Sequence, residues 1–450
     1  MSLKPKKTNG WIATIAVAMA NYIEAGSIIA AASSLSLWQA YLNINNWQLG
    51  LLSALSANAL GAAIGALIGG PLTDKLGRKF IFKYDLLLYM LGILIIILSI
   101  NLPMLLIGTI IVGIAVGIGV PVAWTYIAEE APEKERAKRV GTAQLAWSIG
   151  PAITFTLAVM LAPLGLLGAR LIFLHLFIIA GITWWIRQGM EESQIWEDEK
   201  EKEKSQSSLN VKKTSAFKEL FTNPVNLKAM LLLIGIYLFW NLTSGAMGYF
   251  MPFIYESVGG LTGAQANILQ AILWLCTVIT TYFGFMKLGD RISQRFLFSV
   301  GAMMGIIAWI ILTFAPMNWV SLILFVLLWG SAAGIGAQAF YALWTSELFP
   351  TRYRAGAQGL MYFIVRAGIS VYTFVLPTIL SSLGFKVTGI IMISFLAIHA
   401  VIGIILTPKT QGKTLESIER ERYGESTDTN SSLDLSKGTN TLIQEGETKI

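Results

Sequence analysis

Two charged residues lie deep inside long apolar stretches of this chain and are its first candidates for chemistry. Glu24 is 13 residues beyond Trp11, the first residue of its stretch, and Arg366 is 11 residues beyond Ala355, the first of another. At 1.5 Å per helical residue, Glu24 lies roughly 20 Å along a helix. A charge at mid-membrane depth is costly unless it is paired or protonated, so such residues usually mark a pathway.

The carboxyl group of Glu24 is predicted to bind and release a coupling proton, because burial favours the neutral form of a carboxyl group. A neutral Glu24 that only hydrogen-bonds to a neighbouring helix is the alternative. For Arg366 the sequence leaves three interpretations. Its guanidinium pairs with Glu24, binds the carboxylate of a substrate in a bidentate manner, or caps backbone carbonyls.

The elements that hold these residues are membrane helices. Of 450 residues, 55% are hydrophobic and 13% are charged, about half the charged fraction of a soluble domain. Apolar runs of about 20 residues, each long enough to cross a ~30 Å hydrocarbon core, recur from Trp11 to Leu406. We count twelve of them and predict an all-α membrane protein.

The distribution of Lys and Arg sets the orientation. With both termini in the cytoplasm, 30 of the 33 basic residues lie on the inner side and only Arg170 and Lys386 lie in outer loops. This is the bias of an inner or plasma membrane protein, so the net charge of +7 does not indicate a nucleic-acid partner. The expected partners are the lipid bilayer, a small solute and a proton, and the chain is expected to be a monomer.

The sequence repeats itself. The pattern E-x-x-P-x-x-x-R-x-x-x-x-G begins at Glu129 and again at Glu347, 218 positions later. Asp74 and Asp290, after the second span of each half, are 216 positions apart. The repeats predict two pseudo-symmetric six-helix bundles at 1–187 and 227–407, joined by a cytoplasmic linker at 188–226 and followed by a largely disordered tail at 408–450. Duplicated bundles with a substrate site between them are a transporter architecture.

These motifs carry a resemblance to a known family. The loop Gly70-Pro-Leu-Thr-Asp-Lys-Leu-Gly-Arg-Lys79 resembles the signature of the major facilitator superfamily. The two E-x-x-P-x-x-x-R loops, the stretch 190–196 and Pro408–Glu416 resemble the sugar porter and metabolite–proton symporter group. The sequence of the first span is similar to that of bacterial inositol transporters in this group. The resemblance implies the major facilitator fold, with substrate and proton carried by alternating access.

The resemblance also says where substrate contacts lie, and where this chain departs from the group. Thr109 stands where sugar porters usually carry an Arg, and the paired glutamines of their seventh span are replaced. A standard hexose site is therefore not intact. Polar and aromatic mid-span residues suit the hydroxyl groups and C–H faces of a polyol, and each has interhelical packing as its alternative. The candidates are Asn21, Gln144, Trp240, Asn241, Gln270, Gln338 and Tyr341.

Charged loop residues have a different predicted role. By the same resemblance they form ion pairs between the halves that close a cytoplasmic gate, whereas positive-inside topology alone explains only the cations. The predicted gate residues are Asp74, Arg78, Glu129, Arg136, Asp290, Arg295, Glu347 and Arg354.

The sequence therefore favours a proton-coupled symporter of a neutral polyol or sugar of the inositol type. The alternative is a symporter of a small organic acid, niacin-like or an aromatic carboxylate, with Arg366 as its anion site. We expect no cofactor and no metal, since two isolated His do not make a metal site. A membrane enzyme is disfavoured because intramembrane catalysis needs clustered catalytic groups. Four-residue glycine spacings at Gly61, Gly65 and Gly69, and at Gly113 and Gly117, predict close helix packing.

Overall fold

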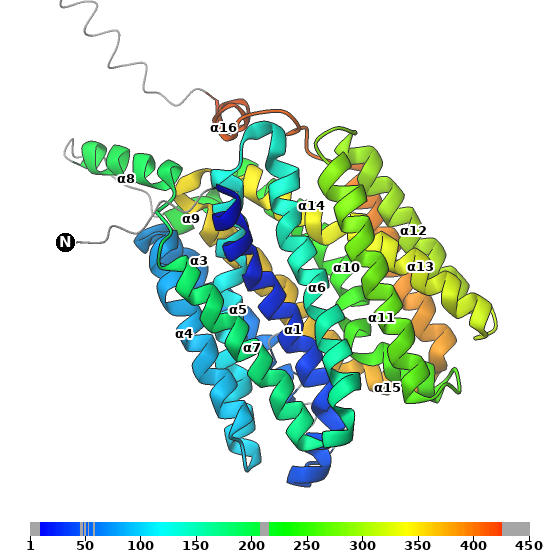
Figure 1. The fold of residues 1–450 in the computed structure, drawn as a ribbon. Helices are drawn as coiled ribbons and strands as arrows, with labels where there is room; N and C mark the ends of the chain where they lie inside the picture. Colours follow the sequence, from blue (N-terminus) through cyan, green and yellow to red (C-terminus); the bar gives the residue numbers. More distant parts are fainter. Residues whose placement is uncertain are drawn as a thin grey trace, which may run out of the picture. The chain divides into compact units, whose positions relative to one another are not determined.

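The computed structural model describes residues 10–424, apart from 46, 47, 49, 50, 53, 57, 58 and 208–215. Its first half consists of six helical segments that pack against one another (Figure 1). They are α1 (Gly10–Leu42), α3 (Leu60–Leu76), α4 (Arg78–Ile97), α5 (Leu102–Glu130), α6 (Arg136–Leu161) and α7 (Leu166–Arg187). The predicted second span falls partly outside the described residues, and α3 is its remaining part.

The second half repeats this arrangement with two modifications. Its helices are α10 (Pro224–Ser257), α11 (Gly263–Thr280), α12 (Gln294–Phe314), α13 (Trp319–Ile335), α14 (Ala337–Glu347) and α15 (Arg354–Ile405). The tenth span is divided into α13 and α14 at Gly336, whereas α15 runs through two spans across a kink at Gly384, where φ is 77°. A positive φ is readily adopted only by glycine, so this residue allows the chain to turn back.

Eleven helical segments in the described part of the chain are long and apolar enough to cross a membrane. With α3 included, the architecture is the predicted one of twelve transmembrane helices in two six-helix bundles. The linker contributes α8 (Gln194–Ser207) and α9 (Ala216–Thr222). In the tail, α16 (Leu415–Tyr423) belongs to a separate unit that starts at Lys413, and the predicted disorder beyond residue 424 lies outside the described residues.

Glycines set the closest helix contacts, as their spacing predicts. In the first half, a side chain at Gly65 would clash with the carbonyl of Ile114, and one at Gly117 would clash with that of Ala62. The backbones of α3 and α5 therefore touch. Gly359 of α15 meets the carbonyl of Ala66 in the same way, so α3 also packs tightly against the second half.

Candidate functional site

Glu24 and Arg366 meet across the two halves. The Arg366 guanidinium on α15 forms an ion pair with Glu24 Oε1 on α1, and the Tyr362 hydroxyl donates to the same oxygen at 2.5 Å. All three residues are buried, Glu24 with none of its surface exposed and Arg366 with 2%. Of the alternatives left open by the sequence, the geometry is that of a charge pair between halves, and Arg366 binds a carboxylate supplied by the protein itself.

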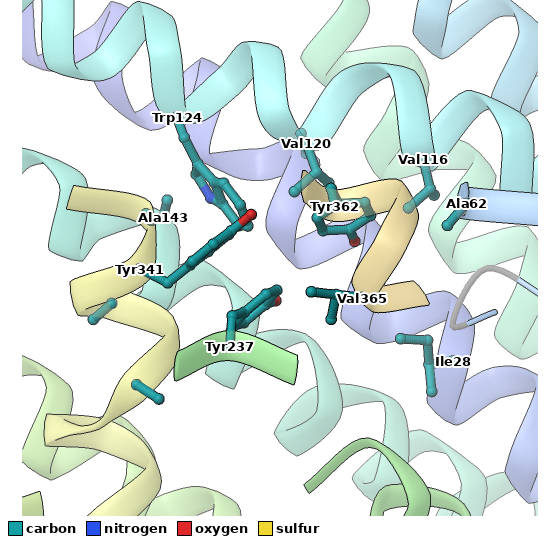
Figure 2. Close-up of a cluster of buried hydrophobic side chains, with 14 of the residues drawn as sticks. Ile28, Ala62, Val116, Val120, Trp124, Ala143, Tyr237, Tyr341, Tyr362 and Val365 are labelled. Carbon is teal, nitrogen blue, oxygen red and sulfur yellow. The ribbon is translucent and has the colours of Figure 1, made fainter. Parts of the chain in front are cut away.

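An aromatic cluster adjoins this pair through Tyr362. Figure 2 shows its rings, which belong to Trp124, Tyr237, Tyr341 and Tyr362. The rings of Tyr237 on α10 and Tyr341 on α14 stack with centroids 3.9 Å apart, and Trp124 on α5 meets the edges of Tyr341 and Tyr362. Trp124 Nε1 also donates to Asn21 Oδ1 at 2.9 Å. Of the predicted substrate residues, Asn21 and Tyr341 thus join a single cluster built from both halves.

Gln144 is on α6 and Gln270 is on α11, two helices of opposite halves that pack against each other. Both side chains are buried, at 4% and 5% exposure. The contact is made by two indoles, Trp147 on α6 and Trp274 on α11, with ring centroids 5.2 Å apart. Neither tryptophan was among the predicted substrate residues. The available signal was the spacing, because Trp147 follows Gln144 by three positions and Trp274 follows Gln270 by four, which places each pair on one helix face.

The remaining substrate candidates are Trp240 and Asn241 on α10 and Gln338 on α14. Trp240 is buried beside Tyr237, with ring centroids 6.3 Å apart. The Asn241 amide donates to the Tyr237 carbonyl of its own helix at 3.0 Å, so part of its hydrogen-bonding capacity is used locally. Gln338 is buried in the first turn of α14, three positions before Tyr341.

The predicted gate residues form a reciprocal network at one end of the two bundles. Glu129 of the first half accepts from Arg354 of the second at 2.7 Å, and Glu347 of the second accepts from Arg136 of the first at 3.1 Å. The two pairs are related by the same displacement of 218 positions that relates the sequence repeats. Arg78 adds a bidentate contact to Glu129, with distances of 2.9 and 3.1 Å. All five residues are buried.

The two aspartates of the network differ from the prediction of ion pairs between halves. Asp74 accepts the backbone N–H groups of Ala355 and Gly356 at the start of α15. Asp290 accepts those of Ala137 and Lys138 at the start of α6, at 3.1 and 3.0 Å. Each aspartate therefore caps a helix of the opposite half, where free N–H groups and the helix dipole favour an anion.

Burial makes these two aspartates weaker acids. It raises the pKa of Asp74 to about 7, against the lowering effects of Arg78 and of the Gly356 and Ala355 N–H groups. Burial likewise raises the pKa of Asp290, although its backbone hydrogen bonds act in the opposite direction. Removing a carboxylate from water is unfavourable. The contact between the halves at these aspartates is therefore stabilised by their hydrogen bonds.

Arg295 does not join the network. Its residue is exposed, and within the described part of the chain its guanidinium makes no ion pair. The repeat explains the difference, because the displacement of 216 places Gln294, and not Arg295, at the position of Arg78. Gln294 is buried and accepts from Trp344 Nε1 at 2.8 Å.

The loop motif Gly70–Lys79 is completed by the segment after the sixth span. Glu192 accepts the backbone N–H groups of Arg78 and Lys79 at the start of α4, at 2.9 and 3.0 Å. Gly77, with φ of 94°, lies directly against its carboxylate, where a side chain would clash. Trp196 Nε1 donates to the Asp74 carbonyl at 3.0 Å. The beginning of the linker is thereby fixed to the gate.

A second buried ion pair was not predicted from the sequence. Arg187, the last residue of α7, contacts Asp85 of α4 at 3.1 Å and donates to the carbonyls of Ala16 and Val17 on α1 at 3.0 Å each. By count both charges lie near the ends of their spans, which is why they resembled ordinary loop charges. A small cavity lined by Asp85, Tyr89 and Ile23 lies beside the pair. The pair ties α1, which carries Glu24, to the rest of the first half.

Comparison with known proteins gives the family. The family model of the major facilitator superfamily matches residues 10–372 and 242–443. The chain belongs to the major facilitator superfamily. It is a multi-pass membrane transporter and not an enzyme, and its fold and motifs are those that the sequence predicts.

Individual members of the superfamily are also similar to this transporter. The minor myo-inositol transporter IolF of Bacillus subtilis is 42% identical over 413 residues, which cover 91% of this chain and 94% of the relative. The arabinose-proton symporter of the same organism is 25% identical over 81% of this chain and 85% of its own. Among solved structures, the proton:xylose symporter XylE has a TM-score of 0.78 at 17% identity, covering 91% of this chain and 98% of that one. This structural likeness concerns the fold.

Proposed function

We propose that this transporter carries a neutral polyol of the inositol type together with a proton, by alternating access in the inner or plasma membrane, as a monomer with both termini in the cytoplasm. The observation that carries the proposal is the buried ion pair between Glu24 and Arg366, which joins α1 of the first half to α15 of the second. The similarity to a myo-inositol transporter and to an arabinose-proton symporter supports the choice of substrate and coupling ion.

The pair supplies a coupling mechanism. When Glu24 is ionised, Arg366 and Tyr362 of the second half hold it, and the halves are joined. A proton on Glu24 removes the charge that Arg366 binds, so the contact weakens and the halves are free to move. One proton moving down 100 mV supplies ~2.3 kcal/mol, which corresponds to about fiftyfold accumulation of the solute.

The same contact argues against the alternative that the substrate is an organic acid. Arg366 already binds a carboxylate, so a substrate anion has to displace Glu24 or share the guanidinium with it. Two carboxylates beside one guanidinium repel each other in a low-dielectric site. A neutral solute meets no such competition.

The substrate class is tested by uptake of labelled myo-inositol into proteoliposomes in the presence of unlabelled competitors. We expect stereoisomeric inositols and related polyols to compete, and nicotinate, benzoate and other small carboxylates to leave uptake unchanged at equal concentrations. Competition by the carboxylates alone would instead support the organic acid alternative. Sodium added at constant ionic strength serves as the control for the coupling ion and is expected to have no effect.

A further inference from the structure

The contact between α6 and α11 carries four polar atoms that the protein leaves unpartnered. Gln144 Oε1 and Trp147 Nε1 lie on α6, and Gln270 Nε2 and Trp274 Nε1 lie on α11. All four atoms are buried, and none has a hydrogen-bond partner among the described residues. Because buried polar groups are nearly always hydrogen-bonded in native proteins, a group of four at one interface points to a ligand.

The four residues belong to two helix faces that meet. The spacings of three residues on α6 and four on α11 place each glutamine and its tryptophan on one helix face. The two faces meet because the Trp147 and Trp274 rings lie 5.2 Å apart, inclined at 59°. One half of the transporter therefore supplies an acceptor and a donor, and the other half supplies two donors. Hydroxyl groups, which both donate and accept, match this set, and indole faces suit the C–H surface of a ring.

Trp147 has a second neighbour. Its indole N–H approaches the Glu24 carboxylate, although it makes no hydrogen bond of ordinary geometry there. Glu24 Oε1 is bound by Arg366 and Tyr362, whereas Oε2 has no partner in the described part of the chain. Trp147 thus lies between the contact of α6 with α11 and the carboxyl group of the proposed proton-binding residue.

Building on the proposed function, we infer that Trp147 and Trp274 form the two aromatic walls of the polyol site, one from each half. Trp147 is in addition the residue through which a bound polyol affects Glu24. Binding draws the two halves together through the indoles and the glutamines. A hydroxyl at Trp147 takes up the indole N–H that otherwise faces Glu24, so substrate and proton binding are linked through one side chain.

Trp309 on α12 carries a comparable indole. Its Nε1 is also buried without a partner among the described residues. It lies within the second half, however, where its ring packs against Phe325 and Trp329. Trp309 therefore provides a matched control: its indole N–H is buried without a partner in the same way, but its ring packs against a helix of its own half.

The test compares Trp147→Phe, Trp274→Phe and Trp309→Phe in reconstituted transporter. Each change keeps an aromatic ring and removes the N–H donor. For the first two we expect the KM for myo-inositol to rise about tenfold, the upper range for losing one hydrogen bond to a neutral group. Trp309→Phe is expected to leave KM within about twofold of the parent, since it loses no ligand contact.

The pH dependence of uptake distinguishes the role of Trp147 from that of Trp274. The charged or titratable groups around Glu24 are Arg366 and Tyr362 on α15 and Tyr237 on α10. None of these is altered by the variants. Trp147→Phe is therefore expected to shift the pH dependence of uptake, and Trp274→Phe is expected to raise KM without shifting it. Identical pH profiles for all variants would overturn the link to Glu24.

Monodeoxy inositols give a readout that does not depend on how well each variant folds. One hydroxyl of the substrate is expected to contact each indole. Removing that hydroxyl and changing the tryptophan to phenylalanine eliminate the same hydrogen bond, so their effects on KM do not add. Full additivity for every hydroxyl at both tryptophans would refute the assignment. Absence of myo-inositol uptake by the unaltered transporter would instead refute the proposed function, so the two failures are distinguishable.

Discussion

Glu24→Gln is expected to abolish uphill accumulation of the solute and to leave exchange of labelled for unlabelled solute intact. Glutamine has nearly the shape of a protonated glutamate but does not ionise, so Arg366 loses its partner and the carrier stays in the proton-loaded condition. Accumulation should fall from up to about fiftyfold at 100 mV to equilibration. Uptake driven by a pH gradient and counterflow, both in proteoliposomes, measure the two quantities.

The control for this variant is Glu133→Gln, which removes a carboxylate from an exposed position in the loop before α6. It should accumulate solute normally. Counterflow also guards against misfolding, because an unfolded carrier loses exchange as well as accumulation. If Glu24→Gln accumulated solute against a gradient as well as the parent does, Glu24 would not be the coupling residue.

Charge reversal in the gate is expected to have the second large effect. Arg136→Glu places two carboxylates where Arg136 and Glu347 now form a buried pair between the halves. Breaking a buried pair costs about 3–5 kcal/mol, enough to reverse the populations of two states that differ by a few kcal/mol. Transport should fall by at least about a hundredfold, and the inner side should stay open.

Opening is measured with a cysteine reporter. The native Cys276 is first replaced by Ser. Ala143, which is buried on α6 beside the aromatic cluster (Figure 2), is then replaced by Cys. A membrane-impermeant maleimide applied from the cytoplasmic side should label the reporter faster in Arg136→Glu than in the parent. Lys134→Ala, at an exposed position in the same loop, should not change labelling. The double change Arg136→Glu with Glu347→Arg should recover part of the closure, and no recovery would argue against a pairwise gate.

The repeat in the sequence carried more information than composition did. The displacement of 218 positions predicted two bundles, and the structure shows the same displacement in the gate, where Glu129 pairs with Arg354 as Glu347 pairs with Arg136. The sequence had grouped these residues without assigning their partners. Arg295 was assigned to the gate for its charge. The displacement of 216 positions, however, aligns Gln294 and not Arg295 with Arg78. The helix-capping role of the aspartates was not predictable, because it depends on where the opposite half presents its helix ends.

The site was only partly visible in the sequence. Glu24 and Arg366 were found because a charge far from either end of an apolar run is rare, and their pairing needed the positions of α1 and α15. Trp147 and Trp274 were missed because a tryptophan in a membrane helix is ordinarily a packing or interface residue. Only the approach of α6 to α11 shows that the two indoles face each other. Asp85 and Arg187 were missed because each lies near a span end.

The central claim is that a proton on Glu24 accompanies the solute, and substrate-driven proton movement tests it most directly. Proteoliposomes with a trapped pH indicator and no imposed ion gradient are given external myo-inositol, in the presence of a potassium ionophore that prevents a potential from building up. The lumen is expected to become acidic with the parent transporter and to remain unchanged with Glu24→Gln. Uptake of labelled inositol by the parent without acidification would contradict the account.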